Sequence, residues 1–238
     1  MEKPLVLILT PTPGEYAGVA NRLAGKERAR FRHWIIESGP GKINAAAALA
    51  AALAPLKRDK RPPALILGVG TAGSLSHALK AGEVVVADEA IVGDWRHDDG
   101  DEIHVGPYAV FAYGPPDPAR VEAMAIKSRS PLASGLKALL EREGFTPGRV
   151  LTTDSFVAGR ENKLRLGELY KAAVCDMESG AFAWTAEKIF GVPWLCLRIV
   201  ADSLDETLND YFLKERDVTE VLGEKTALAL DLADQLLA

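Results

Sequence analysis

Five short apolar runs, each next to a glycine or proline, constrain the fold more than any other feature of this sequence. They cover residues 5–9, 64–67, 83–87, 149–152 and 193–200. Apolar and polar residues do not alternate along these runs, which is typical of strands that are covered on both faces. The runs therefore predict an α/β fold in which helices enclose a central sheet.

Four further segments have helical patterns. They cover residues 43–56, 130–143, 177–190 and 218–237. The first is almost entirely alanine and leucine, which cost little to hold in a helix. Ser130 and Pro131 suit the N-cap and the first position of the second helix. Because no internal repeat and no linker-like tract divides the chain, we expect a single domain over residues 1–238.

The charge balance excludes one class of function. The chain has 28 basic and 33 acidic residues and a formal net charge of -5. Nucleic-acid-binding proteins need an excess of positive charge, so we expect no nucleic-acid partner. The first apolar run has only five residues, too few for the apolar region of a secretion signal or for a membrane span. We expect a soluble, cytoplasmic protein with no membrane partner.

Neither a metal site nor a disulfide is predicted. Cys175 and Cys196 lie in apolar runs without another cysteine or histidine at ligand spacing, so we expect reduced, buried thiols. His97 and His104 belong to an acidic stretch over residues 94–104. Their spacing fits no compact metal motif, and we interpret the stretch as a solvated loop.

Two glycine-rich segments follow predicted strands. They are residues 38–44, Ser-Gly-Pro-Gly-Lys-Ile-Asn, and residues 68–74, Gly-Val-Gly-Thr-Ala-Gly-Ser. The second matches neither a dinucleotide-binding fingerprint nor a P-loop. Ligands bind at such turns in open α/β sheets, but a connection that only needs glycine geometry has the same pattern. Taken alone, both segments leave these two interpretations open.

Six short elements in a fixed order resemble the nucleoside phosphorylase and nucleosidase superfamily. They are residues 13–15 (Pro-Gly-Glu), 38–44, 68–73, 153–156 (Thr-Asp-Ser-Phe), 176–178 (Asp-Met-Glu) and 197–202 (Leu-Arg-Ile-Val-Ala-Asp). The Met-Glu pair followed by Arg-x-x-x-Asp is the most specific element. The resemblance covers nearly the whole chain and is closest to methylthioadenosine/S-adenosylhomocysteine nucleosidases. It implies a three-layer α/β/α fold with a twisted, mixed central sheet.

The resemblance implies a ribose site around Glu178. Glu178 would accept hydrogen bonds from the 2′- and 3′-hydroxyls, and Met177 would pack beneath the sugar. A carboxylate suits a diol because it can accept from two donors at once. Without the family pattern, Glu178 would be interpreted as an exposed acid in the first turn of a helix. Asp176 and Arg198 are implied to lie behind the site, with Arg198 holding Glu178 or its neighbours in place.

The resemblance also implies a purine site. Asp202 would protonate N7 as the glycosidic bond breaks, which suits an acid because cleavage builds negative charge on the base. Phe156 would stack on the base, and Phe212 would line the pocket around the 5′ substituent. The alternatives are a helix cap for Asp202 and a core position for Phe156. Other implied substrate-binding residues are Thr71, Ala72, Gly73 and Val157.

The nucleophile is predicted to be water rather than phosphate. Phosphorylases of the superfamily carry arginines in the first loop and before the glycine-rich element, whereas this chain has Gly68 at the second position and no arginine or lysine in residues 10–16. Instead, Glu15 aligns with the nucleosidase glutamate that orients and deprotonates water. An acid there repels phosphate but suits a neutral nucleophile. The alternative is a simple helix-start acid.

The substrate is less constrained than the reaction. This chain has Thr71 and Ala201 where the family usually has serine, and Asp176 where adenosine-thioether enzymes tend to have glutamate. Thr12 and Pro40 stand where those enzymes have apolar residues near the 5′ pocket. We rank methylthioadenosine and S-adenosylhomocysteine first, then aminodeoxyfutalosine and futalosine, then other 5′-substituted adenosines.

The resemblance implies no cofactor, because two carboxylates and binding energy suffice for this chemistry. It implies a homodimer in which the partner chain completes the 5′ pocket. A purine nucleoside phosphorylase is the competing enzyme. A non-catalytic nucleoside-binding protein is the least favoured alternative, because Glu15 and Asp202 are both present.

Overall fold

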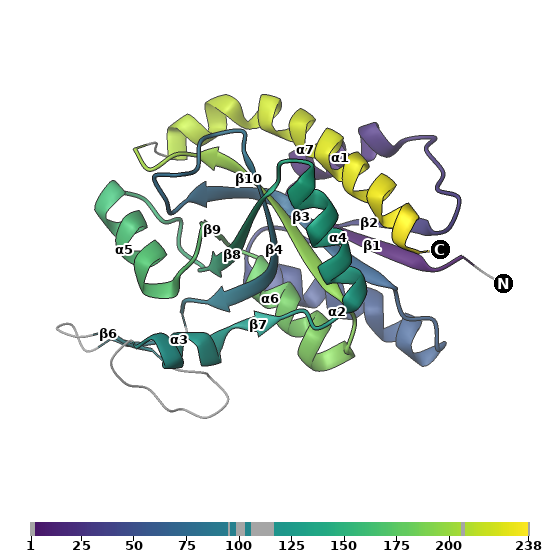
Figure 1. Ribbon diagram of the computed structural model, residues 1–238, viewed down its shortest axis with the longest axis horizontal. Helices are drawn as coiled ribbons and strands as arrows, with labels where there is room; N and C mark the ends of the chain where they lie inside the picture. The colour runs from purple at the N-terminus through teal and green to yellow at the C-terminus, as the bar shows by residue number, and fades with distance from the viewer. Residues whose placement is uncertain (1–2, 95, 99–102, 106–116, 206–207, 238) are drawn as a thin grey trace.

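The structure is a computed structural model, shown in Figure 1. It describes residues 3–94, 96–98, 103–105, 117–205 and 208–237. For residues 96–98, 103–105 and 208–217 it describes the backbone alone.

The central sheet is mixed and has eight strands, in the order β10-β4-β8-β9-β3-β1-β2 with β7 paired to β4. Its strands are β1 (Leu5–Thr10), β2 (Arg32–Glu37), β3 (Leu65–Ser74), β4 (Val84–Val92), β7 (Ile126–Lys127), β8 (Thr146–Thr152), β9 (Val174–Asp176) and β10 (Trp194–Asp202). β3 also pairs with β10, so that β3, β10, β4, β8 and β9 form a closed ring of paired strands. β5 (Arg96–Asp98) and β6 (Ile103–Val105) pair antiparallel in a separate two-stranded sheet.

Helices cover both faces of the sheet (Figure 1). They are α1 (Pro13–Leu23), α2 (Lys42–Arg58), α3 (Pro118–Met124), α4 (Pro131–Arg142), α5 (Arg160–Tyr170), α6 (Ser179–Trp184) and α7 (Leu208–Leu236). β1 shows why its run does not alternate. Val6 and Ile8 pack in the core beneath α1, α4 and α7, whereas Leu7 and Leu9 pack in the core beneath α2 and α6. The predicted three-layer fold with a mixed sheet is confirmed.

The glycine-rich residues 68–74 are not a turn, as the sequence suggested, but the last seven residues of the ten-residue strand β3. Glycine normally weakens a strand, yet here it allows close packing. A Cβ at Gly68 would lie 2.3 Å from the ring of Phe182. Residues 38–41 do form a connection that requires glycine, since Gly39 and Gly41 have φ angles of 83° and 89°, whereas residues 42–44 already belong to α2.

Three of the predicted helices begin or end differently in the structure. Ser130 is the N-cap of α4 as predicted and accepts a hydrogen bond from the amide of Leu132. The helix predicted from residue 177 begins at Ser179, with Glu178 as its N-cap, and becomes a π-helix (η2) at Thr185–Phe190. The helix α2 begins one residue before its predicted start and ends two residues beyond its predicted end, and α7 begins ten residues before its predicted start.

Helices α1 and α7 touch through glycine. A Cβ at Gly18 would lie 2.4 Å from the carbonyl oxygen of Thr219, and one at Gly223 would lie 2.4 Å from the carbonyl oxygen of Gly18. The two backbones therefore pack closer than helices separated by side chains. This contact fixes α1, whose first turn reaches the cavity described below.

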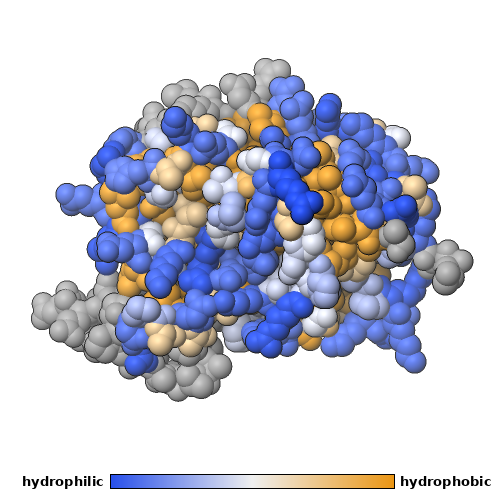
Figure 2. Space-filling view, in the orientation of Figure 1, coloured by the Kyte–Doolittle hydropathy of each residue, from blue (hydrophilic) through white to orange (hydrophobic). Residues whose placement is uncertain are grey.

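Figure 2 shows hydrophilic side chains over most of one face, with apolar side chains grouped between them. Among the described helices, none combines the length and the apolar character needed to cross a bilayer.

Candidate active site

A cavity of about 320 Å³ lies where β1, β3, β8, β9 and β10 end. This volume is in the range of small-molecule sites. Most of the predicted site residues line it: Glu15, Thr71, Ala72, Gly73, Phe156, Val157, Asp176, Met177, Glu178 and Asp202. Arg198 lies behind the wall, and the side chain of Phe212 falls outside the described residues.

Glu15 is buried and is held by both carboxylate oxygens. It occupies the third position of α1, where Oε2 accepts hydrogen bonds from the amide and the hydroxyl of Thr12, both at 3.0 Å. Oε1 accepts from the amide of Thr71 at 2.7 Å and from its hydroxyl at 2.9 Å. The two interpretations of Glu15 are thus not exclusive, since it completes a capping box and also lines the cavity. Burial raises its pKa, although the bonds from Thr71 and the charge of Arg198 oppose that rise.

Glycine allows Arg198 and Glu15 to approach the same strand. A Cβ at Gly70 would lie 2.7 Å from Nη1 of Arg198 and 3.2 Å from Oε1 of Glu15. Arg198 Nε donates to Asp176 at 2.7 Å and to the hydroxyl of Ser179 at 3.0 Å. Its Nη1 is buried and has no hydrogen-bond partner in the described part of the chain.

Asp176 lines the cavity instead of lying behind it, as the sequence had indicated, and it joins β9 to three other elements. Besides Arg198 on β10, it accepts from the hydroxyl of Thr152 on β8 at 2.6 Å. It also accepts from the amide of Ser179, the first residue of α6, at 3.0 Å. These contacts position Glu178, which lies between Asp176 and α6 in the sequence.

Glu178 is buried rather than exposed, and its Oε1 accepts from the amide of Gly41 at 2.8 Å. Burial, together with the nearby negative charge of Asp176, raises the pKa of Glu178 to about 7. The charge of Arg198 and the bond from Gly41 oppose this shift. The segment containing Gly41 therefore does more than connect β2 to α2. Its Gly41 amide donates to Glu178, the residue predicted to bind ribose, and its Pro40 lines the cavity.

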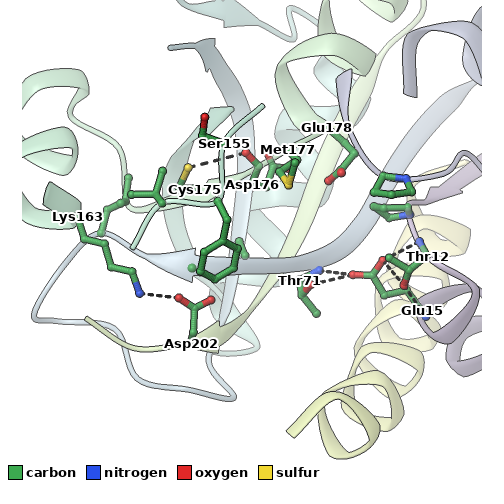
Figure 3. Close-up of a pocket in the computed structure, with 17 residues that line it drawn as sticks. Thr12, Glu15, Thr71, Ser155, Lys163, Cys175, Asp176, Met177, Glu178 and Asp202 are labelled. Atoms are coloured by element: carbon green, nitrogen blue, oxygen red, sulfur yellow. Dashed lines mark hydrogen bonds and ion pairs between the residues drawn. The ribbon is translucent and has the colours of Figure 1, made fainter. Parts of the chain in front are cut away.

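Asp202 lies across the cavity from Glu15 (Figure 3). It pairs in register with Gly73 after a bulge in β10, and a Cβ at Gly73 would lie 2.9 Å from its Oδ2. Nζ of Lys163 donates to that oxygen at 2.6 Å. Phe156 is partly exposed at the cavity wall and is not a core residue.

Lys163 also lines the cavity, although it was not predicted from the sequence. A signal was present, because Lys163 shares one face of α5 with Leu166, Gly167 and Tyr170, and all four are buried. Its partner, however, is 39 residues away in the sequence. Among the described residues that line the cavity, Lys163 is the only cation.

The described residues contain no group of three or more histidine, cysteine, aspartate or glutamate side chains placed to hold a metal ion. The side chains of His97 and His104 fall outside the described residues. Cys175 lines the cavity, but burial raises its thiol pKa to about 12. It is therefore a poor nucleophile.

Comparison with known proteins supports a single family. The sequence profile described as the phosphorylase superfamily matches residues 6–238. A 5′-methylthioadenosine/S-adenosylhomocysteine nucleosidase of an Exiguobacterium species is 31% identical over 202 residues, covering 82% of this chain and 78% of that protein. One from Staphylococcus aureus strain bovine RF122 / ET3-1 is 29% identical over 173 residues, covering 71% and 67%.

Solved structures share the fold. The Helicobacter pylori 5′-methylthioadenosine/S-adenosylhomocysteine nucleosidase, in complex with a pyrrolidine-based ligand, has a TM-score of 0.76 at 20% identity and covers 97% of this chain and 99% of its own. A futalosine hydrolase mutant from Helicobacter pylori has a TM-score of 0.75 at 20% identity, covering 96% and 99%.

Proposed function

We propose that this chain, which belongs to the phosphorylase superfamily, hydrolyses the N-glycosidic bond of a 5′-substituted adenosine-type nucleoside to free base and a ribose derivative. The observation that carries the proposal is Glu15. It is a buried carboxylate, held by both oxygens, at the end of the cavity opposite Asp202.

Water fits the Glu15 end better than phosphate does. Glu15 and Glu178 both line the cavity and would repel a phosphate dianion. Arg198, the nearby cation, is already paired with Asp176. Its Nη1 is buried behind the cavity wall, so in this proposal Glu15, rather than Arg198, orients the water and accepts its proton. The raised pKa of Glu15 suits a general base.

Glu178 and Met177 form the ribose site in this proposal. The ionised Glu178 accepts from the two ribose hydroxyls, and the amide of Gly41 holds its carboxylate in place. Asp176 and Arg198 fix the start of α6 and therefore the position of Glu178.

Asp202 acts on the purine, and Phe156 stacks on it. When the C1′–N9 bond breaks, its electron pair stays on the base, and N7 takes the proton of the Asp202 carboxyl group. Water adds to C1′ and its proton passes to Glu15. Exchange with solvent then returns a proton to Asp202 and removes one from Glu15, so charge and protons balance.

The substrate proposed first is methylthioadenosine or S-adenosylhomocysteine, which the names of the sequence relatives support. Futalosine and aminodeoxyfutalosine come second, supported by the shared fold of futalosine hydrolase. The test is release of free base from adenosine, methylthioadenosine, S-adenosylhomocysteine, inosine and futalosine, with and without phosphate. We expect phosphate-independent release from an adenosine thioether. Release only with phosphate would make the protein a phosphorylase, and no release would favour a binding protein.

We also propose a homodimer that uses α2. Ile43, at the start of this helix, has an exposed fraction of 82%, and Trp34 on the edge strand β2 is also exposed. Ile43 lies two residues after Gly41, so a partner seated there would lie near the cavity. We expect light scattering to show a dimer, and Ile43→Glu to give a monomer with a higher KM. A monomeric wild-type protein would contradict the proposal.

A further inference from the structure

Lys163 is a buried cation on the wall of the cavity. Its side chain has an exposed fraction of 1%, and its Nζ donates to Asp202 Oδ2 and to the carbonyl oxygen of Ser203, both at 2.6 Å. Burying an ammonium group is costly unless it is paired and hydrogen-bonded. Both of these partners belong to the end of β10 that faces the proposed purine site.

The surrounding backbone is built to bring this pair together. Gly167 allows α5 to pack against the end of β3, because a Cβ there would lie 2.5 Å from the carbonyl oxygen of Leu75. Gly73 leaves room for the carboxylate of Asp202. The bulge between Val200 and Asp202 changes the direction of the strand just before the carboxylate.

We propose that Lys163 is a positioning residue for the reaction proposed above, which orients Asp202 and stabilises its carboxylate as it gives its proton to the leaving base. The inference rests on that proposed function. During cleavage the O–H bond of Asp202 breaks and the N7–H bond forms. Lys163 keeps all of its protons, and its positive charge lies 2.6 Å from the oxygen where negative charge appears.

The second hydrogen bond of Lys163, to the carbonyl oxygen of Ser203, explains how it orients the side chain of Asp202. The same ammonium group holds Oδ2 of Asp202 and the carbonyl of the next residue, Ser203. Two fixed points at the end of β10 restrict rotation of the Asp202 side chain. A preorganised acid of this kind needs little rearrangement during the reaction.

The test separates charge from packing with three variants. Lys163→Gln keeps a hydrogen-bond donor but removes the charge, Lys163→Arg keeps the charge, and Arg165→Met removes a cation from the exposed side of the same helix. Each is assayed for kcat and KM with the panel nucleoside that the wild type hydrolyses fastest. Circular dichroism and thermal unfolding check that each variant is folded.

We expect Lys163→Gln to lower kcat by about 100-fold while KM changes by less than about three-fold. Lys163→Arg should restore most of kcat, and Arg165→Met should match the wild type. A folded Lys163→Gln variant with the kcat of the wild type would overturn the inference, as would equal losses for the Gln and Arg variants. If Lys163→Gln does not fold, a folded Lys163→Arg variant decides, because a 100-fold loss there contradicts a role for charge and near wild-type kcat supports it.

Failure of the inference can be told apart from failure of the proposed function. If the wild type hydrolyses a nucleoside without phosphate and Lys163→Gln does so equally well, only the role of Lys163 is wrong. If the wild type releases no base, both are wrong.

Discussion

Two buried ion pairs of similar geometry lie beside the cavity. Arg198 and Asp176 are 2.7 Å apart, and Lys163 and Asp202 are 2.6 Å apart, with all four side chains almost fully buried. They differ in what surrounds the carboxylate. Asp176 also accepts hydrogen bonds from Thr152 and Ser179, and its cation Arg198 lies behind the cavity wall, whereas both members of the second pair line the cavity. The first pair is therefore suited to hold the site together and the second to take part in its chemistry.

The largest effect is expected from Glu15→Gln, which tests whether the Glu15 end of the cavity activates water. Turnover should fall by about 1,000-fold or more, because an amide cannot accept the water proton. Nucleoside affinity, measured by calorimetry, should change little. Glutamine is also accepted in a capping box, so the free energy of unfolding should fall by less than about 2 kcal/mol. If the variant kept the turnover of the wild type, another group would have to be the general base.

Arg198→Met tests the structural half of the comparison. It leaves the carboxylate of Asp176 buried without its cation, next to Glu178, and should lower the free energy of unfolding in urea by about 3–5 kcal/mol. The control is Lys127→Met, which removes a half-exposed cation from Glu89 and Glu122. That variant should lose less than about 1 kcal/mol. Equal losses would mean that burial does not distinguish the two ion-pair networks.

The pKa of Glu178 predicts two opposite responses to pH. A carboxyl group whose pKa is higher in the folded state stabilises the fold fully below its unfolded value, near 4.5, and loses that contribution as pH rises through about 7. The empty protein should thus lose about 2–3 kcal/mol of unfolding free energy between pH 5 and 8. Ribose binding needs the ionised form, so KM should fall about ten-fold between pH 6 and 8.

The control for both responses is Glu178→Gln, which has no carboxyl group to titrate. Its unfolding free energy should vary less over this pH range, and its KM should be high and nearly constant. A wild-type KM that does not change with pH would show that Glu178 does not bind the diol as a carboxylate.

The smallest effect is expected at the cavity rim. Lys42, two residues after the cavity-lining Pro40, forms ion pairs with Asp94 and Asp154, whose side chains are partly exposed. Lys42→Met should cost less than about 1 kcal/mol of unfolding free energy. It should raise KM by no more than about three-fold, and high salt should have a similar effect on the wild type. A larger loss of unfolding free energy would show that the ion pairs of Lys42 stabilise the fold as much as the buried ion pairs do.

Particular residues show why the fold was easier to predict from sequence than the site. β1 and β10 could be predicted because strands buried on both faces lack alternation, and α4 because its cap is local. The glycine-rich residues 68–74 of β3 could not be predicted as a strand, because the ring that packs on Gly68 comes from Phe182, which is far away in the sequence. The spacing of Lys163 with Leu166, Gly167 and Tyr170 indicates a buried face of α5, but only the tertiary structure brings Asp202 to its ammonium group. Glu15, Glu178 and Asp202 were identified through the order of family motifs, but their burial and their hydrogen bonds depend on tertiary structure.

The glycine contact between α1 and α7 limits how this protein can vary. Glu15 lies only three residues before Gly18, where the backbone of α1 touches that of α7. Any side chain at Gly18 or Gly223 must push the helices apart and so shift the first turn of α1 relative to Thr71. Two positions that never meet the substrate are thus expected to tolerate almost no substitution, and a survey of neutral variants should find them nearly as restricted as the carboxylates.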